Sequence, residues 1–254
     1  MTAALSLGIA AAAGPALAER VAPAAEAAGF HALWVNDTPG HDALAMLAAA
    51  AGATERLVLA TGVLPVDRRT TDDIVVAASG LPAGRLVLGI GSGQARSGAV
   101  ELVTDAATEL RRRTDARVVV GALGPRMRRA AAAASDGVLL SWLTPQVAAA
   151  QAAQAHDIAP ATHVALYVRT AVDDAAVAAL DEETARYAGY PAYAANFARL
   201  GVDAADTVIR PAELRDRIAA YRAGVDEVVL RAITPTGSAD DHLRFIDAIA
   251  EAVA

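Results

Sequence analysis

The chain has no cysteine, few aromatic residues and no excess of basic charge. The absence of cysteine excludes disulfides, catalysis by a thiolate and any metal site built on cysteine ligands. Aromatic residues make up only 4% of the 254 residues, whereas hydrophobic residues make up 55%. Much of that hydrophobic share is alanine, the best helix former, so we expect many helices packed against a core of Val, Leu and Ile.

The net charge of −7 argues against a nucleic-acid partner, which usually requires a clustered basic face. The densest basic run, Arg111-Arg112-Arg113, follows a predicted helix, where cations stabilise the C-terminal end. No run of about 18 apolar residues predicts a membrane span. The apolar segment 1–28 lacks an early basic residue and is interrupted by Gly14-Pro15, unlike a signal peptide. We therefore expect a soluble cytoplasmic protein that acts on a small molecule.

Short β-branched runs alternate with longer alanine-rich helical runs. The eight predicted strands are Leu5–Ile9, Ala32–Val35, Leu57–Ala60, Arg85–Ile90, Arg117–Val120, Val138–Leu140, His163–Thr170 and Glu227–Arg231. A helix follows each strand, and the longest helical stretch, from about Asp173 to Leu200, is broken near Gly189-Tyr190-Pro191. This alternation predicts parallel strands with right-handed crossovers, and eight units in about 250 residues fit a closed (β/α)8 TIM barrel.

An open doubly wound sheet is the alternative fold. It normally has fewer units and a glycine-rich first βα turn, and the turn Ala10–Gly14 has no G-x-G-x-x-G pattern. We therefore predict one TIM-barrel domain over residues 1–254. In such a barrel the site lies in the βα loops at the carboxyl ends of the strands.

The loop after the second strand, Asn36–Asp42, carries groups suited to proton transfer. It offers the carboxylate of Asp37, the hydroxyl of Thr38 and the imidazole of His41. Asp42 is better explained as the N-cap of the next helix. We predict that Asp37 and His41 are catalytic.

Glycine-rich segments follow three further strands. Gly62 permits unusual dihedrals or a close ligand approach. Gly89–Gly93 lacks the dinucleotide spacing, but its backbone amides could cradle a phosphate or a ring. Gly124 precedes a helix that begins at Pro125, so free amides there could bind an anion, with charge added by Arg126.

Several other side chains near the strand ends have two interpretations each. Arg68 and Arg69 could meet an anion or lie on the plain surface. Trp142, after the sixth strand, could contact a ligand or simply pack. Arg231, at the end of the last strand, could line the mouth of the pocket.

Other catalytic motifs are missing. The chain has no H-E-x-x-H, no P-loop lysine motif and no G-x-S-x-G nucleophile elbow, and it shows no metal cluster. The sequence therefore favours chemistry carried by an organic cofactor.

These loops resemble one family. Leu88-Gly89-Ile90-Gly91-Ser92-Gly93, together with Thr61-Gly62-Val63-Leu64-Pro65, resembles the luciferase-like monooxygenase superfamily. Gly121–Met127, Ser135–Leu140 and Trp142–Pro145 are similar to its deazaflavin-dependent branch. The resemblance covers essentially the whole chain from Leu7.

The resemblance implies a barrel that binds coenzyme F420, or FMN in other members, and transfers a hydride to or from a substrate. A bulge with a non-proline cis peptide behind the flavin ring would fall at Thr61, Gly62 and Val63. Polar groups near the reactive ring carbon would be Asp37, Thr38 and His41. The phosphate loop would be Ala122, Leu123 and Gly124, beside Gly91, Ser92 and Gly93, with Trp142 at the same face.

The chain also departs from longer family members. Only about two dozen residues separate the fourth and fifth strands, so the insertions that cover the site and support dimers are shortened. The leading hypothesis is an F420-dependent oxidoreductase, with a homodimer expected by analogy. The alternatives are an FMN-dependent monooxygenase, which usually needs a better sealed pocket, or a non-catalytic barrel that binds a flavin or deazaflavin.

Overall fold

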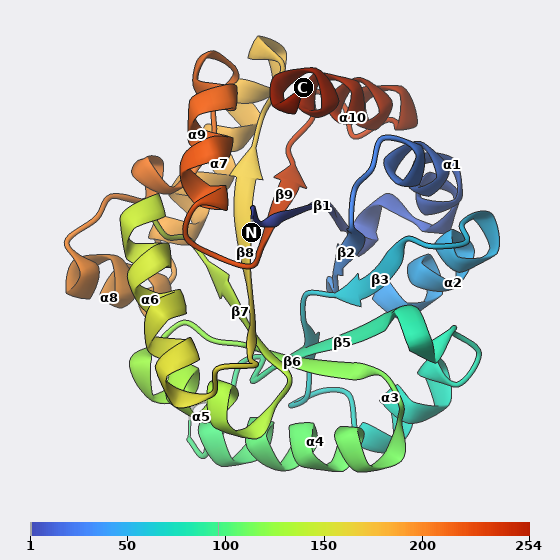
Figure 1. Ribbon diagram of the computed structural model, residues 1–254, viewed down its shortest axis with the longest axis vertical. Helices are drawn as coiled ribbons and strands as arrows, with labels where there is room; N and C mark the ends of the chain where they lie inside the picture. Colours follow the sequence, from blue (N-terminus) through green and yellow to red (C-terminus); the bar gives the residue numbers. More distant parts are fainter. Residues whose placement is uncertain (1, 96) are drawn as a thin grey trace.

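The strands close into a parallel barrel that is surrounded by helices (Figure 1). The computed structural model describes residues 2–95 and 97–254. The strands are β1 Ala4–Ala10, β2 Ala32–Asn36, β3 Val58–Thr61, β4 Leu64–Pro65, β5 Leu86–Gly91, β6 Arg117–Gly121, β7 Gly137–Ser141, β8 His163–Thr170 and β9 Glu227–Ala232. The α-helices are α1 Pro15–Ala27, α2 Ala43–Ala53, α3 Thr71–Ala78, α4 Ala99–Arg113, α5 Pro125–Ala134, α6 Pro145–Ile158, α7 Val177–Ala188, α8 Pro191–Leu200, α9 Leu214–Arg222 and α10 Ala239–Val253.

Barrel closure follows from the pairing of the strands. Their order is β3-β2-β1-β9-β8-β7-β6-β5-β4, and β3 also pairs with β5, so the sheet has no free edge at this point. Every pairing is parallel. The predicted TIM barrel is confirmed, and each of the eight predicted strands is present with ends shifted by at most one residue.

Strand β4 was not predicted, because it continues β3 after a bulge. Ala60 pairs with Val87, and Leu64 pairs with Ile90. Four steps on one strand therefore match three steps on the other, which leaves one extra residue, the definition of a β-bulge. The Gly62–Val63 peptide bond inside the bulge is cis. The bulge and the cis peptide that the resemblance implied are both present.

Glycines on the neighbouring strands make room for this bulge. A Cβ atom on Gly89 would lie 1.9 Å from the carbonyl oxygen of Thr61. Cβ atoms on Gly91 and Gly121 would lie 2.6 and 2.9 Å from methyl groups of Val63. Any larger residue at these inward-facing positions would force the strands apart. The Gly89–Gly93 segment thus has a packing role as well as its place beside the site.

Two aromatic rings and a buried carboxylate occupy the barrel interior. Trp34 and Tyr167 meet edge to face, with ring centroids 6.0 Å apart. Toward the amino ends of the strands, Glu227 accepts hydrogen bonds from Ser6 Oγ at 2.5 Å, Trp34 Nε1 at 2.6 Å and His163 Nε2 at 2.8 Å. Burial opposes ionisation of Glu227, but the bonds from His163 and Ser6 outweigh it and hold the pKa of this carboxyl below its usual value. The charge is therefore compensated inside the barrel.

The predicted long helical stretch after β8 is a pair of helices. Gly189 and Tyr190 separate α7 from α8, which begins with Pro191 and ends at Gly201 with φ of 66°. Figure 1 shows α8 at the edge of the molecule, outside the ring of helices. No helix in the described part of the chain has the length and apolar character needed to span a bilayer.

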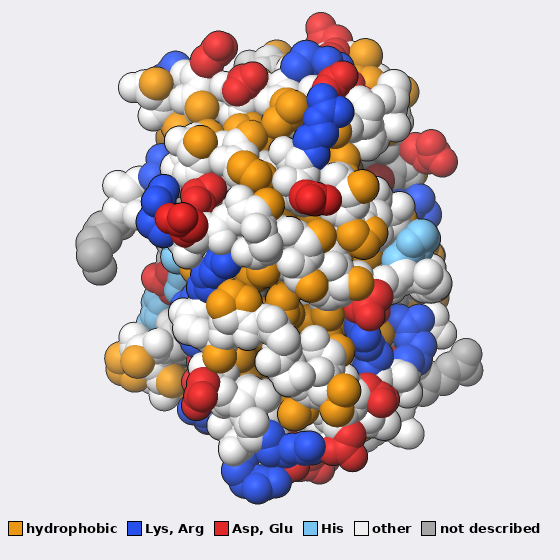
Figure 2. All heavy atoms as spheres, turned by 90° about the vertical axis from the view of Figure 1, so that its right-hand side faces the viewer, with side chains coloured by type: hydrophobic (Ala, Val, Ile, Leu, Met, Phe, Trp, Pro, Cys, Tyr) orange, Lys and Arg blue, Asp and Glu red, His pale blue; other side chains and the backbone are white. Residues whose placement is uncertain are grey.

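The face that carries α1 to α3 has a mixed surface. Figure 2 shows hydrophobic side chains through its middle, with acidic and basic side chains interspersed around them. Large exposed hydrophobic residues in the described chain include Val76 on α3 and Leu102 on α4. Acidic and basic side chains are mixed on the face that this view shows.

The contact between Gly89 and Thr61 leads to a stability prediction. We expect Gly89→Ala to lower the free energy of unfolding by about 1–3 kcal/mol, because the added methyl meets backbone that cannot move freely. For a domain of this size, that loss corresponds to a fall in Tm of several degrees. The matched control is Gly84→Ala, where a Cβ meets nothing within 4 Å and should leave Tm unchanged or slightly raised. Equal melting temperatures for the two variants would contradict the packing argument.

Candidate functional site

A cavity of about 730 Å³ lies at the carboxyl ends of the strands. This volume is within the usual range for small-molecule and cofactor sites. The predicted site residues that line it are Asp37, Thr38, Gly62, Val63, Gly91, Ser92, Gly93, Ala122, Leu123 and Gly124. Loops from four different strand ends therefore converge on one cavity, as the barrel topology predicts.

Four other sequence candidates do not line the cavity. His41 is exposed on the surface loop and is absent from the cavity wall. Thr61 is buried, and its hydroxyl donates to the carbonyl of Gly89 and accepts from the N–H of Gly89, so it fixes the bulge. These placements give no support to a catalytic role for His41 or to direct ligand contact by the Thr61 side chain.

The other two candidates, Trp142 and Arg231, lie behind the wall. Trp142 has φ of 59°, is 1% exposed, and its ring lies beneath the guanidinium of Arg169, 4.2 Å from the ring centroid to Cζ. This position gives no support to the predicted ligand contact, because the ring packs against a wall residue. Arg231 Nε donates to Asn36 Oδ1 at 3.1 Å. Asn36 Nδ2 in turn donates to the carbonyl of Gly62, so Arg231 holds the bulge from behind.

Asp37 is the acidic group on the cavity wall. Its side chain is 8% exposed, and Oδ1 accepts from the N–H of Ala43 at 3.2 Å and lies 3.6 Å from Arg69 Nη1. Burial raises the pKa of Asp37 above the usual value of 3.8, against the opposing effects of the Ala43 N–H and of Arg69. A carboxyl group that resists ionisation beside a ligand cavity is suited to general acid–base chemistry.

Asp42 differs from Asp37 in its environment. It caps α2 by accepting from the N–H groups of Leu44 and Ala45, as predicted, and both of its oxygens accept from Arg69 at 3.1 Å. Burial opposes its ionisation, but the Arg69 hydrogen bonds and charge outweigh this and hold the pKa of Asp42 below 3.8. Arg69 is thus a structural cation, whereas Arg68 lines the cavity.

Sequence analysis missed the wall residues that lie within strands. Ser141, Tyr167 and Arg169 point inward at the carboxyl ends of β7 and β8 and line the cavity. Arg169 Nη1 donates to Ser141 Oγ at 2.8 Å, and its Nε donates to Glu183 at 3.2 Å. The sequence did contain a signal for Arg169. This residue interrupts the apolar run of β8 near its end, and it pairs in register with Arg231 on β9.

Helices α7 and α8 supply the remaining part of the wall. Tyr187, Tyr193, Asn196 and Arg199 all line the cavity. The rings of Tyr187 and Tyr193 meet edge to face with centroids 5.0 Å apart. Three of the five tyrosines of the chain fall between residues 187 and 193, and this clustering was the sequence signal for an aromatic wall.

The cavity is positively charged although the protein is acidic. Arg68, Arg169 and Arg199 line it, against the single carboxylate of Asp37. Of these cations, Arg169 is paired with Glu183 at 3.2 Å, and Arg68 lies 3.9 Å from Asp67. The N-terminus of α5 opens onto the same cavity at Gly124, where an added Cβ would meet no atom within 4 Å. An anionic group would find both a helix N-terminus and arginine side chains here.

Three buried polar groups of wall residues have no hydrogen-bond partner in the described structure. They are the hydroxyls of Thr38 and Tyr167 and Nδ2 of Asn196. Buried polar atoms of this kind are rare unless a ligand or water meets them. Among residues 2–95 and 97–254, no group of three or more His, Asp or Glu side chains is arranged to hold a metal ion.

Comparison with known families agrees with this geometry. Residues 3–115 match the family model of the luciferase-like monooxygenases. The resemblance predicted from the sequence is thus confirmed over β1 to α4 and the start of the following turn, which include the bulge and the Asp37 loop. A search of curated proteins finds no match.

Solved structures of related fold extend the comparison over the whole chain. The coenzyme F420 dependent tetrahydromethanopterin reductase from Methanopyrus kandleri superposes with a TM-score of 0.75 at 16% identity, covering 100% of this chain and 99% of its own. An F420-dependent secondary alcohol dehydrogenase, in complex with an F420–acetone adduct, gives 0.74 at 15% identity, with 98% and 99% covered. The oxygenating constituent of 3,6-diketocamphane monooxygenase from Pseudomonas putida, in complex with FMN, gives 0.71 at 12% identity, with 100% and 98% covered. At such low identities the comparison shows a shared fold. The names of these neighbours include both F420 and FMN.

The contrast between Asp37 and Asp42 can be measured directly. We expect the side-chain carboxyl carbon of Asp37 to titrate above pH 3.8 in an NMR experiment, because burial favours its neutral form. The carboxyl of Asp42, five residues away, is the internal control and should titrate below pH 3.8. Equal midpoints for the two groups, or the reverse order, would remove the basis for Asp37 as a proton donor.

Proposed function

We propose that this chain is an oxidoreductase that uses coenzyme F420 to transfer a hydride to or from a small organic substrate. The observation that carries the proposal is the cationic cavity at the strand ends, where the Gly62–Val63 bulge, the N-terminus of α5 and unpaired polar groups meet. The family match over the first half of the barrel makes oxidoreductase or monooxygenase chemistry the expected class.

The residues present fit a flavin-like cofactor. Gly62 and Val63 of the bulge line the cavity, and because Gly62 has no side chain the face of a ring could approach its backbone closely. Leu123, Gly124 and the amides that begin α5 would hold a phosphate, and Arg199, which also lines the cavity, would balance its charge. The unpaired Thr38 hydroxyl and Asn196 amide would meet polar atoms of the cofactor or substrate.

The chemistry that the cofactor supplies when bound is hydride transfer at carbon C5 of its ring. The protein must then move the accompanying proton. When an alcohol is oxidised, its hydroxyl proton passes to a carboxylate oxygen of Asp37, and in the reverse direction the protonated Asp37 returns it to the carbonyl oxygen. Its raised pKa brings the carboxyl nearer to neutral pH, where proton transfer in both directions is efficient.

An FMN-dependent monooxygenase is the second candidate, favoured by the FMN-containing neighbour. Oxygen chemistry requires that the intermediate be protected from water. The described connection between β5 and α4, residues 92–95 and 97–98, is too short to form a lid, and the cover that exists comes from α7 and α8. This arrangement favours hydride transfer over oxygen activation.

Cofactor binding tests the proposal first. Titration of the purified protein with oxidised F420, followed by fluorescence, should show saturable binding at micromolar concentration or tighter, with FMN weaker. Gly124→Asp should weaken F420 binding by about tenfold or more, because it places a negative charge where the phosphate is expected. Gly84→Asp, the same change at the amino end of β5 with open space around it, is the control and should bind normally.

Two results would count against this assignment. If neither cofactor binds at tens of micromolar, the oxidoreductase proposal fails. If FMN binds more tightly than F420, the monooxygenase candidate replaces it.

The role of Asp37 is tested by turnover. With F420 bound, the parent protein is assayed against secondary alcohols and the matching ketones, because one structural neighbour is an F420-dependent secondary alcohol dehydrogenase. On any substrate that this panel identifies, Asp37→Asn should lower kcat by about 10²–10⁴-fold while leaving F420 affinity unchanged. Asp72→Asn, on the exposed surface of α3 and outside the cavity, should retain parental kcat. Full turnover by Asp37→Asn would assign the proton transfer to another group.

A further inference from the structure

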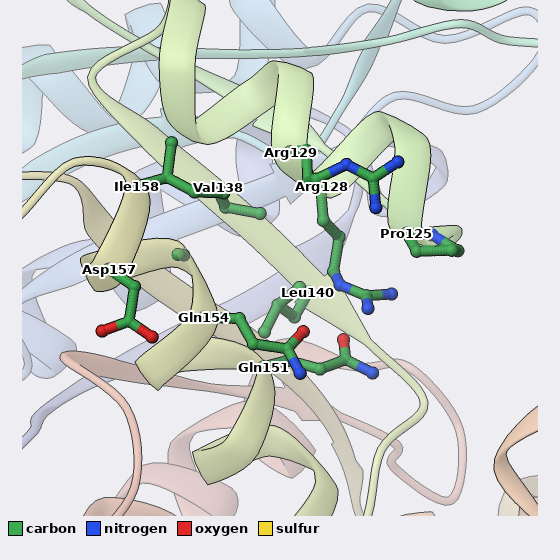
Figure 3. A pocket seen from close by; sticks show the side chains of 10 residues that line it. Pro125, Arg128, Arg129, Val138, Leu140, Gln151, Gln154, Asp157 and Ile158 are labelled. Atoms are coloured by element: carbon green, nitrogen blue, oxygen red, sulfur yellow. The ribbon is translucent and has the colours of Figure 1, made fainter.

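A second cavity lies on the outside of the barrel, between helices α5 and α6. Its volume is about 360 Å³, and strand β7 forms its floor through Val138 and Leu140 (Figure 3). We call it the α5–α6 groove. None of the residues assigned to the cofactor or to proton transfer lines it. The groove therefore needs an explanation of its own.

Arg128 brings a nearly buried positive charge to this groove. Its side chain is only 9% exposed, and its one hydrogen bond in the described structure runs from Nη1 to the carbonyl oxygen of Leu123, at 3.2 Å. No carboxylate pairs with it among the described residues. Its charged neighbours, Arg199 and Arg129, are also cations, and with burial they lower the pKa of Arg128. An uncompensated buried guanidinium is costly unless an anion meets it.

Gln151 supplies a second unpaired donor in the same groove. The residue is 5% exposed, and its Nε2 has no hydrogen-bond partner in the described structure. Figure 3 shows the side chains of Arg128 and Gln151 both directed into the groove, with Asp157 toward its other end. Asp157 forms no ion pair with Arg128, so it leaves that charge unbalanced.

These donors define the chemistry of a ligand. A guanidinium offers parallel N–H groups that match the two oxygens of a carboxylate or phosphate, and a nearby amide adds a further donor. The floor of Val138 and Leu140 would receive an apolar body. We propose that the α5–α6 groove is a binding site for a small oxyanion, a carboxylate or phosphate group, held by Arg128 and Gln151.

The site would lie next to the cofactor cavity without sharing its walls. Arg128 bonds to the carbonyl of Leu123, whose loop lines the strand-end cavity. An anion on Arg128 would therefore act on the reverse side of that loop. This proposal does not depend on the identity of the cofactor, because it is tested in protein without added F420 or FMN.

The test uses butyrate and inorganic phosphate as probes, at constant ionic strength with chloride as the reference anion. Calorimetry should show saturable binding of at least one probe in the millimolar range or tighter, and the side-chain amide resonance of Gln151 should shift on addition. Arg128→Met should weaken that binding by about tenfold or more, and Gln151→Leu by up to about tenfold. Binding of phosphate alone, of butyrate alone or of both identifies which oxyanion source the groove accepts.

Two controls keep the result interpretable. Arg128→Met should melt at or above the temperature of the parent, because it removes an unpaired buried charge, so lost binding would not reflect lost folding. Arg68→Met removes a cation of the strand-end cavity that is not among the charged neighbours of Arg128, and it should leave probe binding intact. The proposal is overturned if neither probe binds, or if binding survives Arg128→Met and is lost in Arg68→Met, which would place the anion in the cofactor cavity.

Discussion

The close packing of the bulged strand against its neighbours is the constraint on which the site depends. The carbonyl of Thr61 occupies the space that a side chain at Gly89 would need, and Val63 does the same at Gly91 and Gly121. Because these three positions carry no side chain, the barrel accepts an extra residue in one strand and still closes. The same bulge turns the Gly62 carbonyl toward Asn36 and places Gly62 and Val63 on the cavity wall. Barrel closure and site geometry therefore rest on one set of contacts.

Buried polar groups are hydrogen-bonded at the amino end of the barrel, whereas some lack partners at the carboxyl end. At the amino end, Glu227 is surrounded by donors from Ser6, Trp34 and His163, so its buried charge is compensated. At the carboxyl end, the hydroxyl of Thr38 and the amide of Asn196 lack partners, and arginines outnumber carboxylates. A fully satisfied network fixes a structure, whereas unsatisfied donors around a cavity are what a ligand completes.

The sequence predicted the barrel well because parallel strands buried on both faces give short, continuous apolar runs, as in 86–91 and 164–168. It located the Asp37 loop and the glycine-rich loops because barrel topology alone puts them at one end. It missed Ser141 and Arg169, because these side chains belong to the ends of strands and the barrel topology directs attention to the loops that follow them. The directions in which the side chains of His41 and Trp142 point depend on local backbone dihedrals, which cannot be read from residue type. The φ of 59° at Trp142, for example, turns its ring beneath Arg169.

The wall formed by α7 and α8 explains how a barrel with short loops can still enclose a ligand. The connection between β5 and α4 is short, and the helix pair after β8 covers the cavity instead. Arg169 connects this helix pair to the barrel. It donates hydrogen bonds to Glu183 on α7 and Ser141 on β7, and its guanidinium lies over the adjoining rings of Trp142 and Tyr187. The bulge and the α5 loop belong to the barrel, while Tyr193 and Asn196 belong to the added helix. The cavity wall thus combines residues of the barrel with residues of an added helix pair, and the helix pair can change in sequence without disturbing the closure of the barrel.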